Sequence, residues 1–225
     1  MTPELIASLQ SNLIVSCQAP PDSPLHQPEI IAAIAKTCVQ RGAIAVRIDT
    51  PSHIIAVKKL LPNVPVIGLW KRIYPNSPVY ITPTLTEVKE IISAGADIIA
   101  IDATSRQRPK ESLVELISYI HQQDKLVMAD IDTAENAIAS EALGVDLIAT
   151  TLYGYTEATC GLTPPGFSLL STLSQRLTTP LICEGGINSP SMAKQALSLG
   201  AYSIVVGTAI TGIDQKVTDF LLNRE

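Results

Sequence analysis

The segment Pro65-Val66-Ile67-Gly68-Leu69-Trp70-Lys71-Arg72 has the pattern of a strand that is buried on both faces. A short, almost continuous apolar run is typical of a parallel strand that is covered on each side. The run ends at two cations, so the amine of Lys71 is expected where the core meets solvent. Burial and the neighbouring charge of Arg72 would both favour loss of its proton. A surface lysine that caps a strand end is the alternative.

Runs of this kind recur along the chain and mostly alternate with stretches of helical periodicity. The predicted strands are Leu13–Ala19, Ala43–Asp49, Pro65–Lys71, Ile98–Thr104, Leu126–Asp132, Leu147–Tyr153, Leu181–Gly186 and Ser203–Ala209. The predicted helices between them include Glu29–Arg41, Thr86–Ala94, Leu113–Gln122, Ala134–Leu143 and Pro190–Leu199. Strands that alternate with helices pair in parallel. The pattern therefore predicts an α/β fold, a single-domain (β/α)8 barrel over residues 1–225, with 1–12 as a short helix across the barrel bottom.

A glycine followed by a small or apolar residue precedes every second predicted strand. The four doublets are Gly42-Ala43, Gly95-Ala96, Gly144-Val145 and Gly200-Ala201. Each doublet follows a helical stretch, where a left-handed glycine ends a helix well. An open doubly wound sheet is the alternative, but it would carry a glycine-rich turn after the first strand. The chain has Gln18-Ala19-Pro20-Pro21 there, which favours the barrel.

Composition restricts the classes of function. The chain is 46% hydrophobic and 16% charged, which predicts a sizeable core. A net charge of −5 argues against a nucleic-acid partner. No apolar run is long enough to cross a membrane, and the basic start of a signal peptide is missing, so we expect a cytoplasmic protein. The four cysteines form no CxxC pair and are expected to be reduced.

The carboxyl ends of barrel strands carry the chemistry of this fold. Strands seven and eight end in Glu184-Gly185-Gly186-Ile187-Asn188 and Val206-Gly207-Thr208. Glycines in these places let backbone N–H groups approach an anion, so we expect a phosphate site there, with simple tight turns as the alternative. The histidines lie away from the strand ends, and His53 and His121 are expected to be solvated helix residues. No metal site is predicted.

Strands three and seven face each other across a ring of eight strands. Lys71 and Glu184 would therefore flank a substrate held by its phosphate. Such a pair suits removal of a proton next to a carbonyl group. A lysine in a barrel also forms Schiff bases, so an aldolase-type reaction stays open, as does a sugar-phosphate-binding protein without turnover.

Seven short motifs, taken in order, closely resemble those of the N-acylglucosamine-6-phosphate 2-epimerases. They are Ser16–Ala19, Gly68–Tyr74, Tyr80–Thr84, Ile101–Thr104, Met128–Ile131, Thr150–Thr156 and Glu184–Ile187. The likeness extends from about Leu13 to Ile210. It implies a barrel enzyme of sialic acid degradation that converts N-acetylmannosamine 6-phosphate to N-acetylglucosamine 6-phosphate without cofactor or metal.

The resemblance also implies roles for individual residues. The catalytic lysine and glutamate of the family fall on Lys71 and Glu184. The predicted substrate-binding residues are Gln18, Arg47, Asp130, Arg72, Gly185, Gly186, Gly207 and Thr208. Family members carry an arginine soon after the last strand, where this chain has Gly212, so Arg72 or backbone donors would have to compensate. The expected partner is a phosphorylated amino sugar. The sequence does not specify the oligomeric state, and a homodimer is considered because it is the commonest symmetric assembly.

Overall fold

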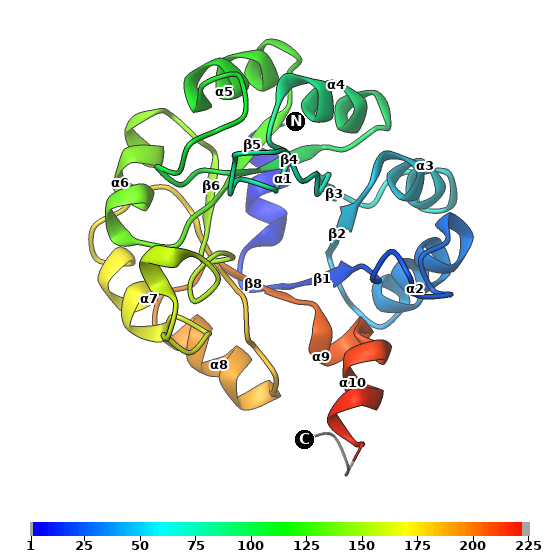
Figure 1. The fold of residues 1–225 in the computed structure, drawn as a ribbon. Helices are drawn as coiled ribbons and strands as arrows, with labels where there is room; N and C mark the ends of the chain where they lie inside the picture. The colour runs from blue at the N-terminus through cyan, green and yellow to red at the C-terminus, as the bar shows by residue number, and fades with distance from the viewer. Residues whose placement is uncertain (1, 222–225) are drawn as a thin grey trace.

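A computed structural model describes residues 2–221 and shows a closed barrel of eight parallel strands that are paired in sequence order (Figure 1). The strands are β1 (Leu13–Cys17), β2 (Ala45–Asp49), β3 (Val66–Leu69), β4 (Ile98–Asp102), β5 (Leu126–Asp130), β6 (Leu147–Ala149), β7 (Leu181–Glu184) and β8 (Ser203–Val206). The predicted barrel is confirmed, and the open sheet is wrong because β1 pairs with β8. Met1 and residues 222–225, part of the predicted range 1–225, lie outside the described chain.

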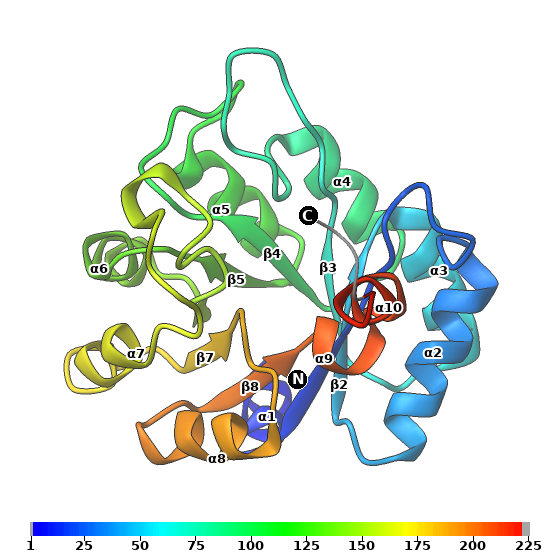
Figure 2. The ribbon, with the colours of Figure 1, turned by 60° about the horizontal axis from the view of Figure 1, so that its bottom comes forward.

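The helices α2 to α8 surround the strands on the outside, whereas α1 lies within the outline of the ring (Figure 1). The helices are α1 (Thr2–Leu9), α2 (Pro28–Gln40), α3 (Pro51–Leu60), α4 (Leu85–Ser93), α5 (Leu113–Gln122), α6 (Ala134–Ala142), α7 (Phe167–Leu173), α8 (Pro190–Ser198), α9 (Thr208–Thr211) and α10 (Ile213–Asp219), with a 3-10 turn at Glu157–Thr159. The five predicted helices between strands all form. Figure 2 shows α9 and α10 on the side of the barrel formed by β1 and β2. There the Ser23 Oγ donates to Asp214 Oδ2 at 3.1 Å and ties the loop after β1 to α10.

Two apolar layers explain why the strand sequences are almost continuously hydrophobic. Successive side chains of a strand point to opposite faces. On β4, Ile98 and Ala100 pack inside the barrel, whereas Ile99 and Ile101 pack against the helices. Both faces of such a strand are buried, so its sequence does not alternate between polar and apolar residues.

The first helix packs against the amino-terminal side of the barrel. Leu9 is fully buried in the inner apolar cluster, and Leu5 and Ile6 pack against the same cluster. The Tyr202 hydroxyl, just before β8, donates to the carbonyl of Ile6 at 3.1 Å. These contacts direct α1 toward the interior of the ring (Figure 1) and leave the carboxyl ends of the strands open.

Most strands end two to four residues before their predicted ends, because the chain turns to build the loops at the carboxyl side. After β3 it folds back on itself. The Arg72 N–H donates to the Tyr80 carbonyl at 2.9 Å, and the Thr82 N–H donates to the Trp70 carbonyl at 2.9 Å. Lys71 forms an isolated antiparallel bridge with Ile81 inside this loop. Residues 70–82 thus form a hairpin-like loop rather than an extension of the strand.

Gly68 is required where β3 lies against α4. A Cβ atom at this position would lie 2.6 Å from both the Ala96 Cβ and the Ile91 Cγ2. Those distances are too short for carbon atoms, so a larger residue would push the helix away from the strand.

We expect Gly68→Ala to destabilise the protein by about 1–3 kcal/mol through overpacking. Urea denaturation would measure the free energy of unfolding. The double variant Gly68→Ala/Ala96→Gly moves one methyl group across the contact and should recover part of the loss, with Ala96→Gly alone as the control. A Gly68→Ala protein as stable as the wild type would contradict the steric account.

Candidate active site

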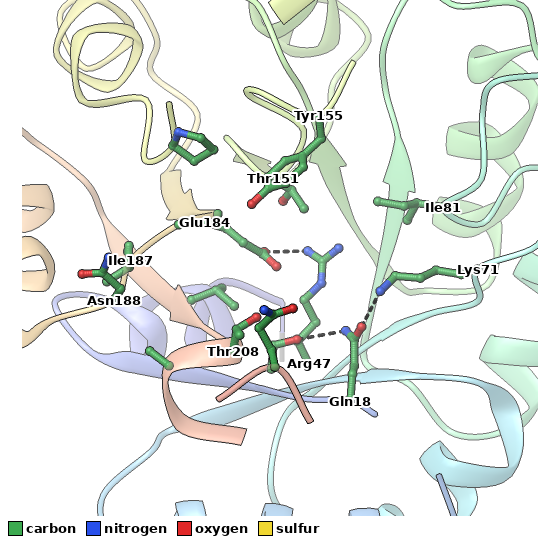
Figure 3. Close-up of a pocket in the computed structure, with 18 of the residues that line it drawn as sticks. Gln18, Arg47, Lys71, Ile81, Thr151, Tyr155, Glu184, Ile187, Asn188 and Thr208 are labelled. Carbon is green, nitrogen blue, oxygen red and sulfur yellow. Dashed lines mark hydrogen bonds and ion pairs between the residues drawn. The ribbon is translucent and has the colours of Figure 1, made fainter. Parts of the chain in front are cut away.

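A cavity of about 680 Å³ opens at the carboxyl ends of the strands (Figure 3). Cavities of this size suit small-molecule ligands. The predicted site residues that line it are Gln18, Arg47, Lys71, Glu184, Gly185, Gly186, Gly207 and Thr208. Arg47 and Glu184 lie on β2 and β7, and the other six follow the ends of β1, β3, β7 and β8. The fold therefore brings eight of the ten predicted positions to one opening.

Arg47 crosses the interior of the barrel and joins three strands. Its guanidinium donates to both carboxylate oxygens of Asp130 on β5, with Nη1–Oδ1 at 3.0 Å and Nη2–Oδ2 at 2.6 Å. Its Nη1 also donates to Glu184 Oε2 on β7 at 2.7 Å (Figure 3). Only 1% of Arg47 is exposed. A bidentate contact of this kind fixes both the distance and the orientation of the guanidinium.

Burial controls the protonation of the three charged groups. It raises the pKa of Glu184 from its ordinary value of 4.5 to about 7, because Asp130 adds to the effect and Arg47 only partly opposes it. Burial alone would lower the pKa of Arg47, but Asp130 and Glu184 outweigh that effect and the pKa is raised. Arg47 is therefore always charged, whereas the carboxyl of Glu184 can gain or lose a proton near neutral pH.

Lys71 lies at the rim of the cavity and is not a buried amine. Its side chain is 45% exposed, and its Nζ lies 3.9 Å from Asp49 Oδ2. The Nζ donates to Gln18 Oε1 at 2.6 Å (Figure 3), and the backbone N–H of Lys71 donates to Asp49 Oδ1 at 3.1 Å. The expected burial is wrong because the chain has already left β3 and entered the hairpin-like loop at this point.

Two predicted site residues lie outside the cavity lining. Asp130 is completely buried behind Arg47, where it also accepts a 2.6 Å hydrogen bond from the Thr151 hydroxyl. Arg72 lines a neighbouring cavity of about 590 Å³ and places its guanidinium 4.9 Å from the centre of the Trp70 ring. Asp130 thus orients Arg47, which lines the cavity, whereas Arg72 lies outside its lining.

The end of the cavity next to β7 and β8 is rich in backbone donors. Gly185 and Gly186 have positive φ angles of 97° and 71°. A Cβ at Gly186 would lie 2.6 Å from the Pro164 Cβ, so only glycine fits. Within residues 2–221, the N–H groups of Gly186, Ile187 and Asn188 donate no hydrogen bond. Free N–H groups beside a glycine turn suit an anion such as a phosphate.

The structure adds several residues that sequence reasoning did not select. They include Tyr80, Tyr155, Gln215, Lys216 and Asp219, all of which line the same cavity. Tyr80 reaches it because the loop after β3 folds back, and the last three residues come from α10. Neither feature has a signal in the periodicity of the sequence, since both depend on how loops close over the strands.

The histidines differ from one another. His53, predicted to be solvated, is only 3% exposed, because the ring of His26 in the proline-rich loop packs edge-on against it at 4.5 Å. His121 lies near the protein surface and pairs with Asp146 Oδ2 at 2.9 Å. In the described part of the chain, no cluster of three or more His, Cys, Asp and Glu side chains has the geometry to hold a metal ion.

None of the helices between residues 2 and 221 combines the length and the hydropathy that crossing a membrane requires.

Comparison with known proteins identifies the family. Residues 31–223 match the family model NanE, described as "Putative N-acetylmannosamine-6-phosphate epimerase". A protein of Synechococcus elongatus named "Putative N-acetylmannosamine-6-phosphate 2-epimerase" is 59% identical over 216 residues, 95% of this chain and 93% of that one. A protein of the same name from Thermosynechococcus vestitus is 57% identical over 218 residues, 96% of this chain and 95% of that one.

Solved structures agree with this result. The N-acetylmannosamine-6-phosphate 2-epimerase from Clostridium perfringens superposes with a TM-score of 0.92 at 43% identity, covering 96% of each chain. The thiamine phosphate pyrophosphorylase from Pyrococcus furiosus superposes with a TM-score of 0.64 at 15% identity, over 97% of this chain and 100% of that one, and shows the barrel fold alone. The resemblance seen in the seven sequence motifs is confirmed, and this chain belongs to the NanE family.

Proposed function

We propose that this protein is an isomerase that interconverts N-acetylmannosamine 6-phosphate and N-acetylglucosamine 6-phosphate by inverting carbon 2. The family supports this activity, and the comparisons do not favour the aldolase or the binding protein without turnover. The observation that carries the proposal is one cavity that holds two proton-carrying side chains, Lys71 and Glu184, together with free backbone donors.

The chemistry needs an acid and a base at one carbon. Once the sugar ring opens, C2 lies next to an aldehyde, and its proton becomes acidic. A base removes this proton to give an enolate with a planar C2, whose negative charge lies on the C1 oxygen. Return of a proton to the opposite face gives the epimer, so no atom is gained or lost overall. Each proton transfer requires a group whose pKa lies near the working pH.

Lys71 and Glu184 suit this task because of their places in the ring. Lys71 follows β3 and Glu184 ends β7, so they approach the cavity from opposite sides (Figure 3). With a pKa of about 7, Glu184 can give or take a proton near neutral pH. Gln18 accepts from the Lys71 amine and holds it at the rim. We assign the proton transfers at C2 to these two residues.

The remaining predicted residues would bind and orient the sugar. Arg47 is oriented by Asp130 and presents a fixed positive charge beside Glu184. This charge would stabilise the negative charge that develops on the enolate oxygen. The free N–H groups near Gly186, together with Gly207 and Thr208, would receive the phosphate. A homodimer and a cytoplasmic location remain predictions from the sequence.

Solvent labelling tests the reaction itself. In D2O, N-acetylmannosamine 6-phosphate incubated with the protein should give both sugars with deuterium at C2, because the abstracted proton exchanges with solvent. Proton NMR would follow the loss of the C2 signal. Conversion without deuterium at C2 would overturn the proposed mechanism. A complete lack of conversion would overturn the proposed function.

Substitution of either proton carrier should abolish most of the activity. We expect Lys71→Met and Glu184→Gln to lower kcat by about 10²–10⁴-fold, the usual contribution of a general acid or base. Steady-state kinetics on the phosphorylated sugar would measure the loss, and circular dichroism would verify folding. A folded variant with nearly full kcat would remove that residue from the mechanism.

The protonation of Glu184 also predicts how stability depends on pH. Its pKa is about 7 in the folded chain against an ordinary 4.5, so the folded state binds more protons between these values. The contribution of Glu184 to the free energy of unfolding is fully present below pH 4.5 and is lost as the pH rises through 7. Relative to Glu184→Gln, the free energy of unfolding of the wild type should therefore fall by up to about 3 kcal/mol over this range. Urea denaturation of both proteins at several pH values would measure the difference, and a constant difference would contradict the raised pKa.

A further inference from the structure

The cavity contains one cation that has no partner. Among the described residues that line it, the positively charged side chains are Arg47, Lys71 and Lys216. Arg47 is held by two carboxylates, and Lys71 is held by Gln18 with Asp49 nearby. The Lys216 side chain makes no hydrogen bond or ion pair with any residue in the range 2–221. An anionic ligand would therefore find its uncommitted positive charge at Lys216.

Lys216 lines the same cavity as the free backbone donors near Gly186. It belongs to α10, which α9 and Gly212 separate from the end of β8, and Gly207 and Thr208 line the cavity as well. Its side chain is partly buried. Asp219, on the same helix, also lines the cavity, but it accepts a 2.7 Å hydrogen bond from the Gln215 side chain. The acidic group is thus engaged by a neighbour, whereas the lysine is free.

Position 212, which lies nearer to β8, cannot carry a cation in the present geometry. Gly212 separates α9 from α10, and a Cβ there would lie 2.8 Å from the Thr208 Cα. A side chain at 212 would collide with backbone, so this junction accepts only glycine in its present form. The Lys216 N–H donates to the Gly212 carbonyl at 2.9 Å, which places the lysine one helical turn further along.

We propose that Lys216 binds the phosphate group of the substrate. The inference rests on the proposed function for the identity of the sugar, but the anion site itself does not depend on turnover. A lysine acts on phosphate as a flexible point charge with three donors, while the N–H groups of Gly186, Ile187 and Asn188 supply directional hydrogen bonds. Lys216 is a binding residue and takes no part in the proton transfers.

Inorganic phosphate tests the site without any reaction. Calorimetry on the full chain should show that Lys216→Met weakens phosphate binding about tenfold, a typical loss for one charge-assisted contact that is partly solvated. Lys216→Arg should retain most of the affinity. The matched control is Lys36→Met, an exposed lysine on α2 outside the cavity, which removes the same charge. Equal affinities in Lys216→Met and Lys36→Met would overturn the proposal.

Kinetics separate this proposal from the proposed function. For the phosphorylated substrate, Lys216→Met should raise KM about tenfold and leave kcat within about twofold, because binding and not proton transfer is affected. Residual turnover of N-acetylmannosamine, which lacks the phosphate, should not change. A fall in kcat with unchanged KM would overturn the binding role. Wild-type protein that binds phosphate through Lys216 but epimerises nothing would overturn the proposed function and support the anion site.

Discussion

The ion cluster of Arg47, Asp130 and Glu184 is the interaction on which the site depends. Burying a charge costs several kcal/mol unless a partner and hydrogen bonds compensate, and here three charges are buried together. The bidentate contact to Asp130 and the single contact to Glu184 satisfy the terminal nitrogens of the guanidinium, while its Nε finds no partner among the described residues. Two carboxylates share one cation, so the cluster is one positive charge short when both are ionised. The raised pKa of Glu184 follows from that deficit together with burial.

The same cluster forms the top layer of the barrel core. Alternate residues of a strand point inward. The inward positions below the three charged residues are Ala45 on β2, Met128 on β5 and Ile182 on β7, each two residues earlier. The interior therefore changes from apolar to ionic within one layer of side chains. The apolar layer excludes water from the side of the cluster that faces the barrel core. The opposite side of the cluster faces the cavity, where a ligand can reach it.

The sequence supports prediction of the layers better than of the loops. All eight strands could be predicted, because a strand that is covered on both faces must be apolar throughout. Their parallel order could be predicted as well, because these apolar segments alternate with helical segments along the chain. Arg47 and Glu184 could be predicted as site residues, because each is a charged residue near the carboxyl end of an apolar strand. The exposure of Lys71 and the burial of His53 could not, since each depends on a loop that folds back over a neighbouring element. Lys216 lies beyond the last strand, where no periodicity applies.

Inversion at a carbon requires access to both faces of a planar intermediate, and the topology of the barrel provides it. In a closed ring of eight strands, β3 and β7 are opposite each other, so Lys71 and Glu184 approach a ligand from different sides. Their supports differ as well. Glu184 is fixed at the end of a strand, where its backbone exchanges hydrogen bonds with the Thr150 hydroxyl at 2.9 and 3.1 Å. Lys71 sits on a loop and presents a half-exposed amine that donates to Gln18 at the rim of the cavity. In the proposed mechanism, two proton carriers on opposite walls allow one binding mode of the phosphate to serve both epimers.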